Sequence, residues 1–529
     1  MVSAFPLTLF SPVLLLLVSA IALSRPGRRP GGFPKWSEMV AFAALLLSAG
    51  GLVQFWLFGP NRIELLNGGM LLAMRADLVS ITMAILVSFI GWVVMRYSRT
   101  YLDGEDQEGS FHGLMLSTLA CVLVLVQAAS MAMLLIASVA VGLTLKRLLL
   151  FYRHRPQAQR ASIKFALVWH GGDLALLVSA IVFAIAFGTG DIAALADTAT
   201  ATGLGVIGNL GVAFLVLAAI LKTAAFPLHG WLTEVMEAPT PVSALLHAGI
   251  INSGGVILIT AAGLVQASPG SMAALVMIGG LTALFGAMVM LTQSAIKTSL
   301  AWSTISQMGF MLLQCGLGLW ALALLHIVAH SLYKAHAFLS SGGAVSAVAA
   351  LRRPGPVAVP SLAAVLRSFA LALVLYGLIA TTFTLFIGPK TAQALALGAI
   401  LIFGVAYLVA QGLADLAPAE LTRRTVAASA AAAIAYFSFQ AAAHLAWGGA
   451  LPKAPIPGPL EWALIVLAVL SFGIVAFAQA LFPLWAHHPA TAGLRVHLAN
   501  GLYLNALLDR AIGGFQTTAT KGNLGERHV

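Results

Sequence analysis

Apolar runs of about 20 residues recur along the whole chain, and short polar or basic segments separate them. A run of this length is long enough to cross a bilayer as an α-helix. Windows of this length predict about fifteen transmembrane helices, centred near residues 14, 48, 87, 119, 139, 176, 214, 252, 280, 309, 331, 374, 402, 435 and 472. The two-residue alternation of barrel strands is absent from the sequence. The pattern therefore predicts an all-α polytopic membrane protein.

The composition and the placement of charge agree with this interpretation. The chain of 529 residues is 60% hydrophobic and 9% charged, with a mean hydropathy of +0.97. The formal net charge of +11 lies in short loops between apolar runs, which is typical of membrane orientation and not of a nucleic-acid surface. Basic residues predict an inner-membrane protein with its amino terminus outside and its carboxyl terminus cytoplasmic. The basic loops and tail contain Arg25, Arg28, Arg29 and Lys35; Lys146, Arg147, Arg153, Arg155, Arg160 and Lys164; Arg352 and Arg353; Arg423 and Arg424; and Arg495, Arg510, Lys521 and Arg527.

The stretch from Leu221 to Thr260 interrupts this apolar pattern with ionisable residues. Lys222 ends one apolar run, and Pro227 then stops the helix because it lacks a backbone N–H and clashes with the preceding turn. His247 lies inside the apolar segment that follows. Ionisable groups within a membrane are costly and usually mark an ion or proton path. We therefore expect Lys222 and His247 to lie on such a path.

Three carboxylates are candidates for the counter-charge of this lysine. Burial lowers the pKa of a lysine and a nearby carboxylate raises it, so such a pair can load and release a proton. Asp173 lies within an apolar run, and Glu234 and Glu237 follow the proline break three residues apart. Each has a plainer interpretation: the lysine could snorkel to the interface, and the two glutamates could form a solvated helix face.

A second set of titratable residues lies further along the chain. His326, His330 and Lys334 follow one another at a spacing of four residues, which places them on one face of a helix. His336 falls elsewhere on the helical wheel. A zinc site needs further ligands that the local sequence does not supply, so the spacing favours a proton relay.

A second interruption of an apolar stretch occurs at Gly388-Pro389-Lys390. Paired broken helices in two halves indicate inverted repeats in transporters, which adds Lys390 to the predicted path; an ordinary loop is the alternative. We expect flanking helices in residues 1–110, two antiporter-like repeats in 111–265 and 266–415, and carboxy-terminal helices with a tail in 416–529.

Motifs for cofactor chemistry are missing from the sequence. There is no phosphate-binding loop, no dinucleotide glycine fingerprint, no haem attachment motif and no cysteine cluster, because Cys121 and Cys315 stand alone in apolar runs. We therefore expect a transporter subunit rather than an enzyme, with no metal or cofactor of its own.

The stretch that begins at Lys222 resembles a known family. It reads K-x-A-x-F-P-L-H-x-W-L-x-x-x-M-E-x-P-T-P-V-S-A-L-x-H-A, and similar matches begin at Lys297 and His330. These segments resemble the proton-conducting, antiporter-like subunits of respiratory complex I and of Mrp-type cation/proton antiporters. The resemblance implies two inverted five-helix repeats with broken helices. It also implies that Lys222 is the central proton carrier and that His247, His330 and Lys334 line the same polar axis.

Two departures from complex I make the resemblance more specific. The family motif W-E-G-x-G-L is replaced by a stretch from Ser138 to Leu143 without a carboxylate, and the chain stops at Val529 where the largest complex I subunit continues. The chain resembles the membrane subunits of DAB-type inorganic carbon transporters. That resemblance implies a DabA-like peripheral zinc subunit that hydrates CO₂ to bicarbonate, powered by flow of protons or sodium ions through this chain. The alternatives are an antiporter-like subunit of a quinone oxidoreductase, hydrogenase or Mrp complex, and a membrane anchor with an inactive channel.

Overall fold

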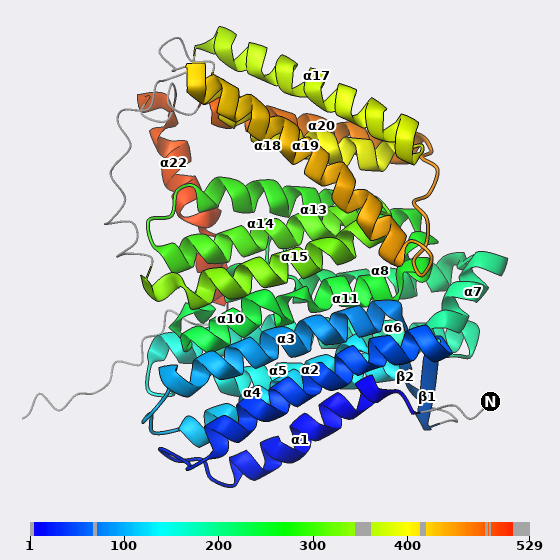
Figure 1. Ribbon diagram of the computed structural model, residues 1–529, viewed down its shortest axis with the longest axis vertical. Helices are drawn as coiled ribbons and strands as arrows, with labels where there is room; N and C mark the ends of the chain where they lie inside the picture. The colour runs from blue at the N-terminus through cyan, green and yellow to red at the C-terminus, as the bar shows by residue number, and fades with distance from the viewer. Residues whose placement is uncertain are drawn as a thin grey trace, which may run out of the picture.

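The computed structural model describes residues 5–66, 71–343, 361–412, 419–481, 485 and 488–511. Long helices lie side by side and run between the same two ends of the molecule (Figure 1). Twelve helices of the described residues are long and apolar enough to cross a membrane, and two shorter apolar helices accompany them. The predicted all-α polytopic fold is confirmed, while the number of about fifteen spans stays a prediction. The basic residues Arg352, Arg353, Lys521 and Arg527 and the division at residue 415 lie outside the described residues.

The helices form three groups along the chain. The first contains α1 (Phe10–Leu23), α2 (Phe33–Phe58), α3 (Leu78–Tyr101), α4 (Glu108–Val126), α5 (Met131–Leu149), α6 (Pro156–Phe187), α7 (Ile192–Thr202) and α8 (Gly205–Lys222). The second contains α9 (Gly230–Glu234), α10 (Thr240–Ala248), α11 (Ser253–Thr260), α12 (Ala262–Gln266), α13 (Pro269–Met290), α14 (Ile296–Gly316) and α15 (Trp320–Leu339). The third contains α17 (Leu362–Ile387), α18 (Ala392–Gly412), α19 (Ala419–Trp447), α20 (Pro459–Ala480), α22 (Ala492–Ala499) and α23 (Leu504–Ala511).

One buried core unites the first two groups, and α17, α18 and α19 have a smaller apolar cluster of their own. Small residues bring helices close together in this core. A Cβ at Gly309 of α14 would lie 2.4 Å from the backbone nitrogen of Ala283 in α13, so only glycine fits there. Close approach of this kind is how helices associate in lipid, where burial of apolar side chains gives little driving force.

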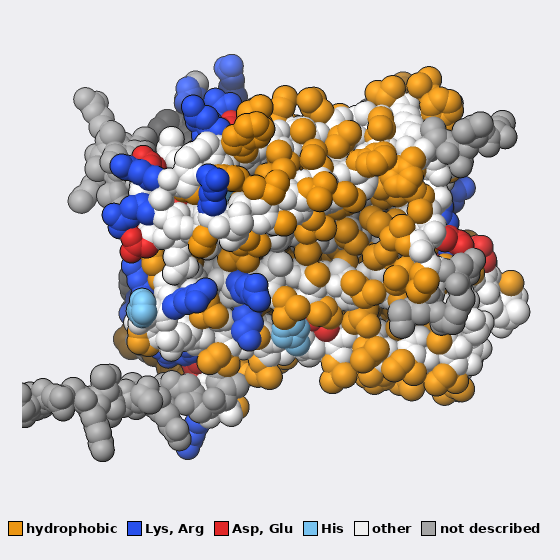
Figure 2. All heavy atoms as spheres, turned by 90° about the horizontal axis from the view of Figure 1, so that it is seen from below, with side chains coloured by type: hydrophobic (Ala, Val, Ile, Leu, Met, Phe, Trp, Pro, Cys, Tyr) orange, Lys and Arg blue, Asp and Glu red, His pale blue; other side chains and the backbone are white. Residues whose placement is uncertain are grey.

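The surface agrees with a membrane setting. Hydrophobic side chains cover a broad central band, and Lys and Arg gather mainly at one end of the bundle (Figure 2). We call this end, which carries the exposed Arg25, Arg28, Lys35, Arg147 and Arg153, the basic end.

A short antiparallel hairpin, β1 (Asn61–Leu66) with β2 (Leu72–Ala76), was not expected from the sequence. It lies outside the apolar spans, and Arg62 of β1 forms an ion pair with Asp191 before α7. Burial opposes ionisation of Asp191, but the hydrogen bond from Arg62 and two backbone amides outweigh it and lower the pKa of this carboxyl.

Candidate functional site

Lys222 and Asp173 form a buried ion pair in the centre of the first group of helices. Lys222 is the last residue of α8 and its side chain is completely buried. Its Nζ lies 2.6 Å from Asp173 Oδ1 of α6 and donates to the Trp169 carbonyl at 3.2 Å. The same Nζ lies 4.2 Å from the centre of the Trp169 ring. Lys222 therefore does not snorkel to the interface, and Asp173 is the predicted counter-charge.

Two further side chains hold the Asp173 carboxylate. Ser138 of α5 donates to Oδ1 at 2.5 Å, and His170 Nδ1 lies 2.8 Å from Oδ2. Ser138 belongs to the stretch in which the family motif has its glutamate. The carboxylate that α5 lacks is thus supplied by α6, one helix further along the chain. Sequence reasoning missed Ser138 and His170; the position of His170, three residues before Asp173 on one helix, was the available signal.

Glycines make room for this arrangement. A Cβ at Gly142 of α5 would lie 2.5 Å from the Trp169 ring, so a side chain there would have to displace this ring. A Cβ at Gly172 would lie 3.3 Å from the Lys222 side chain. The helices α5, α6 and α8 can therefore approach closely enough for Ser138, Asp173 and Lys222 to meet.

His247 lies at a helix break in the middle of the molecule. α10 ends at Ala248, a single 3₁₀ turn covers Ile250–Asn252, and α11 continues from Ser253. The His247 side chain is completely buried, with Nδ1 3.0 Å from Thr304 Oγ1 of α14 and its ring stacked 4.3 Å from Phe338 of α15. The sequence predicted one uninterrupted helix here, because no proline marks the break at Gly249.

The α15 residues extend this group. The His326 and His330 rings lie 6.0 Å apart, and His330 lies against the backbone of His247. Lys334 is completely buried and donates to Ser303 Oγ and the Leu300 carbonyl, both at 2.9 Å. His336 is exposed. The three residues His326, His330 and Lys334 lie on one face of α15, as their four-residue spacing predicted, and their role in a proton path stays a prediction.

Three ring nitrogens in this cluster have no hydrogen-bond partner among the residues that the structure describes. They are the buried Nε2 atoms of His247, His326 and His330. Buried polar atoms without a protein partner commonly bind ordered water. Water between these rings could complete a chain of hydrogen bonds from α10 to α15.

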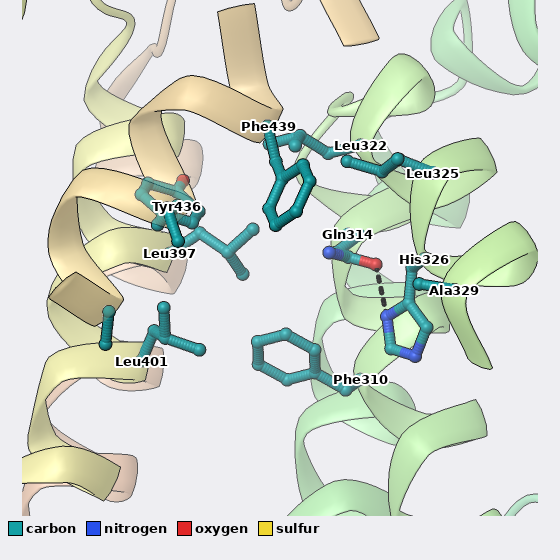
Figure 3. Close-up of a pocket in the computed structure, with 12 residues that line it drawn as sticks. Phe310, Gln314, Leu322, Leu325, His326, Ala329, Leu397, Leu401, Tyr436 and Phe439 are labelled. Atoms are coloured by element: carbon teal, nitrogen blue, oxygen red, sulfur yellow. Dashed lines mark hydrogen bonds between the residues drawn. The ribbon is translucent and has the colours of Figure 1, made fainter. Parts of the chain in front are cut away.

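One end of the cluster meets a cavity of about 350 Å³ between the pair α14 and α15 and the pair α18 and α19 (Figure 3). His326 Nδ1 lies 2.9 Å from Gln314 Oε1 at the wall of this cavity. The rest of the wall is mainly apolar and includes Phe310, Tyr436 and Phe439. The polar cluster therefore ends against an apolar space rather than an aqueous funnel.

The structure does not bring Glu234, Glu237 or Lys390 to Lys222. Glu234 bonds with Lys164 and Asn505, and Glu237 faces Arg155 at 3.7 Å. The two glutamates do not share a regular helix, because α9 ends at Glu234 and a 3₁₀ turn follows. Lys390 lies in the connection between α17 and α18, at a separate cavity of about 760 Å³. That connection is the ordinary loop that was the alternative for Gly388-Pro389-Lys390.

Lys164 was assigned to a basic loop from its position in the sequence, and this was wrong. It lies inside α6 with a completely buried side chain. Glu234 and Asp509 form ion pairs with it there, and both come from distant parts of the chain. Within the described residues no group of three or more His, Cys, Asp or Glu side chains could hold a metal ion.

Two family models match the chain. "NADH:quinone oxidoreductase/Mrp antiporter, TM" covers residues 128–413, and "NADH-Ubiquinone oxidoreductase (complex I), chain 5 N-terminus" covers residues 69–112. The first match includes both α8 and α15, and hence the Lys222–Asp173 pair and the histidine cluster. The fold and the site thus define an antiporter-like transmembrane subunit.

Similar curated proteins show to which group within this class the chain belongs. The "Probable inorganic carbon transporter subunit DabB2" of Halothiobacillus neapolitanus is 35% identical over 95% of this chain and 93% of its own length. The corresponding DabB of Hydrogenovibrio crunogenus is 43% identical over 50% of this chain and 52% of its own length. NADH-quinone oxidoreductase subunit L of Mycobacterium tuberculosis is 33% identical, and the match covers 64% of this chain and only 55% of that protein. The chain therefore belongs to the NADH:quinone oxidoreductase/Mrp antiporter family, within its group of DabB inorganic carbon transporter subunits.

Solved structures show the same fold. The Mrp complex from Dietzia sp. DQ12-45-1b matches with a TM-score of 0.63 and 23% identity, covering 96% of this chain and 59% of that one. The archaeal membrane-bound sulfane sulfur reductase matches with a TM-score of 0.54 and 15% identity, over 94% and 98% of the two chains.

Proposed function

We propose that this chain is the cation-conducting membrane subunit of an energy-coupled inorganic carbon uptake complex. The observation that carries the proposal is the completely buried Lys222, paired with Asp173 at 2.6 Å just before the chain leaves α8. A buried lysine with one movable counter-charge can bind and release a proton as the pair separates and re-forms. The DabB relatives supply the substrate class, which is inorganic carbon.

The path that we infer has two stations. The first is the Lys222–Asp173 pair, and the second is the cluster of His247, His330 and Lys334, with His326 at its far end. Among the described residues, Lys334 donates to a backbone carbonyl and a hydroxyl and to no carboxylate. It can therefore give up its proton without leaving an unpaired anion. Protons are the cation that these groups handle best, and sodium is the other candidate coupling ion.

The chemistry on inorganic carbon belongs to a partner in this proposal. We infer a DabA-like peripheral subunit that carries zinc and hydrates CO₂ to bicarbonate on the cytoplasmic side. The basic end of the bundle would face the cytoplasm, since positive residues are retained on that side. Figure 1 agrees with ends on opposite sides of the membrane, because α22 lies at the end of the bundle opposite to the start of α1 and to β1.

Purification tests the partnership directly. The complex purified from the native membrane should contain a large second subunit with about one zinc ion, and neither flavin nor iron–sulfur absorption at stoichiometric level. The measurement is elemental analysis together with a visible spectrum. Stoichiometric flavin or iron–sulfur absorption would instead support the alternative, an antiporter-like subunit of a redox-driven complex.

Substitutions on α15 test the second station. His330→Ala and Lys334→Ala should each lower uncoupler-sensitive uptake of labelled inorganic carbon at least about tenfold, because both side chains are buried on the inner face. His336→Ala is the matched control, since this histidine lies on the same helix and is exposed. If His336→Ala proves the most damaging of the three at equal expression, the assigned face of α15 is wrong.

A further inference from the structure

A second buried lysine unit lies between α6 and the carboxy-terminal helix α23. Lys164 pairs with Glu234 of α9, and its Nζ lies 2.5 Å from Asp509 Oδ1 and 2.8 Å from Asn505 Oδ1. Asn505 also donates through Nδ2 to Glu234 at 2.7 Å. Lys164 is completely buried, although Glu234 keeps 20% and Asp509 8% of their side-chain exposure. The two α23 residues thus cover a lysine that would otherwise face the basic end.

The charges of this unit do not cancel. One lysine stands against the two carboxylates of Glu234 and Asp509, so the fully ionised unit carries an excess of one negative charge. Excess charge is costly in a buried setting, and a bound cation or proton removes the cost. The unit is therefore suited to take up the kind of ion that the Lys222–Asp173 pair would carry.

An aromatic partition separates the two lysines. Lys164 and Asp173 are nine residues apart on α6, which corresponds to about 14 Å along the helix axis. The Phe165 ring lies 5.3 Å from Trp169 and 5.4 Å from Trp231 of α9, and Trp169 in turn contacts Lys222. The buried Nε1 of Trp231 has no hydrogen-bond partner within the described part of the chain, so the partition contains a polar atom that can bind water.

We propose that Lys164, Glu234 and Asp509 form a gated site at the basic end, through which the transported cation passes between Lys222 and the cytoplasm, with α23 as its lid. The proposal rests on the proposed function, because it assigns the path beyond the partition to Lys222. With α23 seated, the lysine is sealed and its charge is held by the two carboxylates. When α23 lifts, Asp509 and Asn505 leave together, and water reaches Lys164 and Glu234.

The contact between α23 and α9 offers a direct way to hold the lid shut. A Cβ built at Gly230 would lie 3.2 Å from Asn505 Cβ and 2.1 Å from the Asn505 amide oxygen. Disulfides join residues whose Cβ atoms are about 3.5–4.5 Å apart, so a small outward shift of α23 suffices for a bond. Cysteine at position 505 also removes the amide oxygen that would clash.

The first test is the double variant Gly230→Cys/Asn505→Cys in the complete complex. Oxidation should lower uncoupler-sensitive carbon uptake at least about tenfold, and a reductant should restore it, because a bonded lid cannot lift. The two single variants, treated with the same oxidant, are the controls for any reaction of the native Cys121 and Cys315. Full uptake with the bond shown to be formed would overturn the gate. If Lys222→Ala also left uptake intact, the proposed function itself would fail, so the two failures are distinguishable.

The second test does not depend on Gly230 tolerating a side chain. Asn505→Cys in inside-out vesicles should react with a membrane-impermeant maleimide at least about three times faster during transport than with an uncoupler, because lifting of α23 exposes this half-buried position fully. Leu507→Cys, already 60% exposed on the same helix, is the control and should react equally in both conditions. If Asn505→Cys reacts equally fast with and without the uncoupler, α23 does not move during transport and is only a structural contact.

Discussion

Replacing Lys222 by arginine should abolish uncoupler-sensitive uptake of labelled inorganic carbon almost as completely as replacing it by alanine. Arginine preserves the positive charge beside Asp173, but it stays protonated at every physiological pH and cannot act as a carrier. The site is also tight, since the Lys222 side chain lies 3.3 Å from where a Cβ on Gly172 would stand. The measurement is uptake at matched expression and assembly, with and without an uncoupler.

The control for this substitution is Lys35→Arg, an exposed lysine at the basic end, which should leave uptake unchanged. If Lys222→Arg keeps most of the uptake, a fixed positive charge is all that the position requires. Lys222 would then be a structural partner of Asp173, and the membrane-anchor alternative would gain support. Assembly has to be measured for Lys222→Ala in particular, because an unpaired buried Asp173 costs about 3–5 kcal/mol of stability, whereas arginine keeps the positive charge beside it.

The sequence was sufficient to find the main charged residues of the site. Lys222, Asp173, His330 and Lys334 each lie in an apolar run, where an ionisable side chain stands out from its neighbours. The spacing of the α15 residues also determined that they share a face, because helix geometry fixes that from sequence alone. What these residues do in transport stays a prediction.

Partners that depend on tertiary packing could not be found in this way. Ser138 reaches Asp173 only because α5, α6 and α8 approach one another closely. Lys164 looked like a loop residue, since Asn505, which helps to cover it, lies 341 positions further along the chain. The break after His247 has only a glycine to mark it, and glycines are common throughout these helices.

The two helix interruptions that contain a proline have different places in the structure. Pro227 marks a real interruption next to the charged pair, whereas Pro389 marks a connection between α17 and α18 that places Lys390 away from the buried site. A proline removes the same hydrogen bond in both places. Only the surrounding packing decides whether the freed backbone lies within the core or at the edge of the bundle.

Moving the carboxylate from α6 to α5 should restore much of the function that its removal destroys. Asp173→Ser alone leaves the buried Lys222 without a counter-charge and should lower carbon uptake at least about tenfold. Ser138 Oγ lies 2.5 Å from Asp173 Oδ1, so an aspartate at position 138 reaches the same space. The double variant Ser138→Asp/Asp173→Ser should therefore recover at least about one third of wild-type uptake, measured as a double-mutant cycle.

The matched control places the new carboxylate one residue along the same helix. Val139→Asp/Asp173→Ser points the carboxylate about 100° away from the Ser138 direction, so it should recover no uptake. Val139 is also the position that aligns with the glutamate of the family motif. The two double variants therefore compare two positions for a carboxylate on α5, residue 138 and residue 139. Recovery with Val139→Asp but not with Ser138→Asp, at equal assembly, would show that Lys222 takes its counter-charge from the α5 position of complex I and not through the Ser138–Asp173 contact.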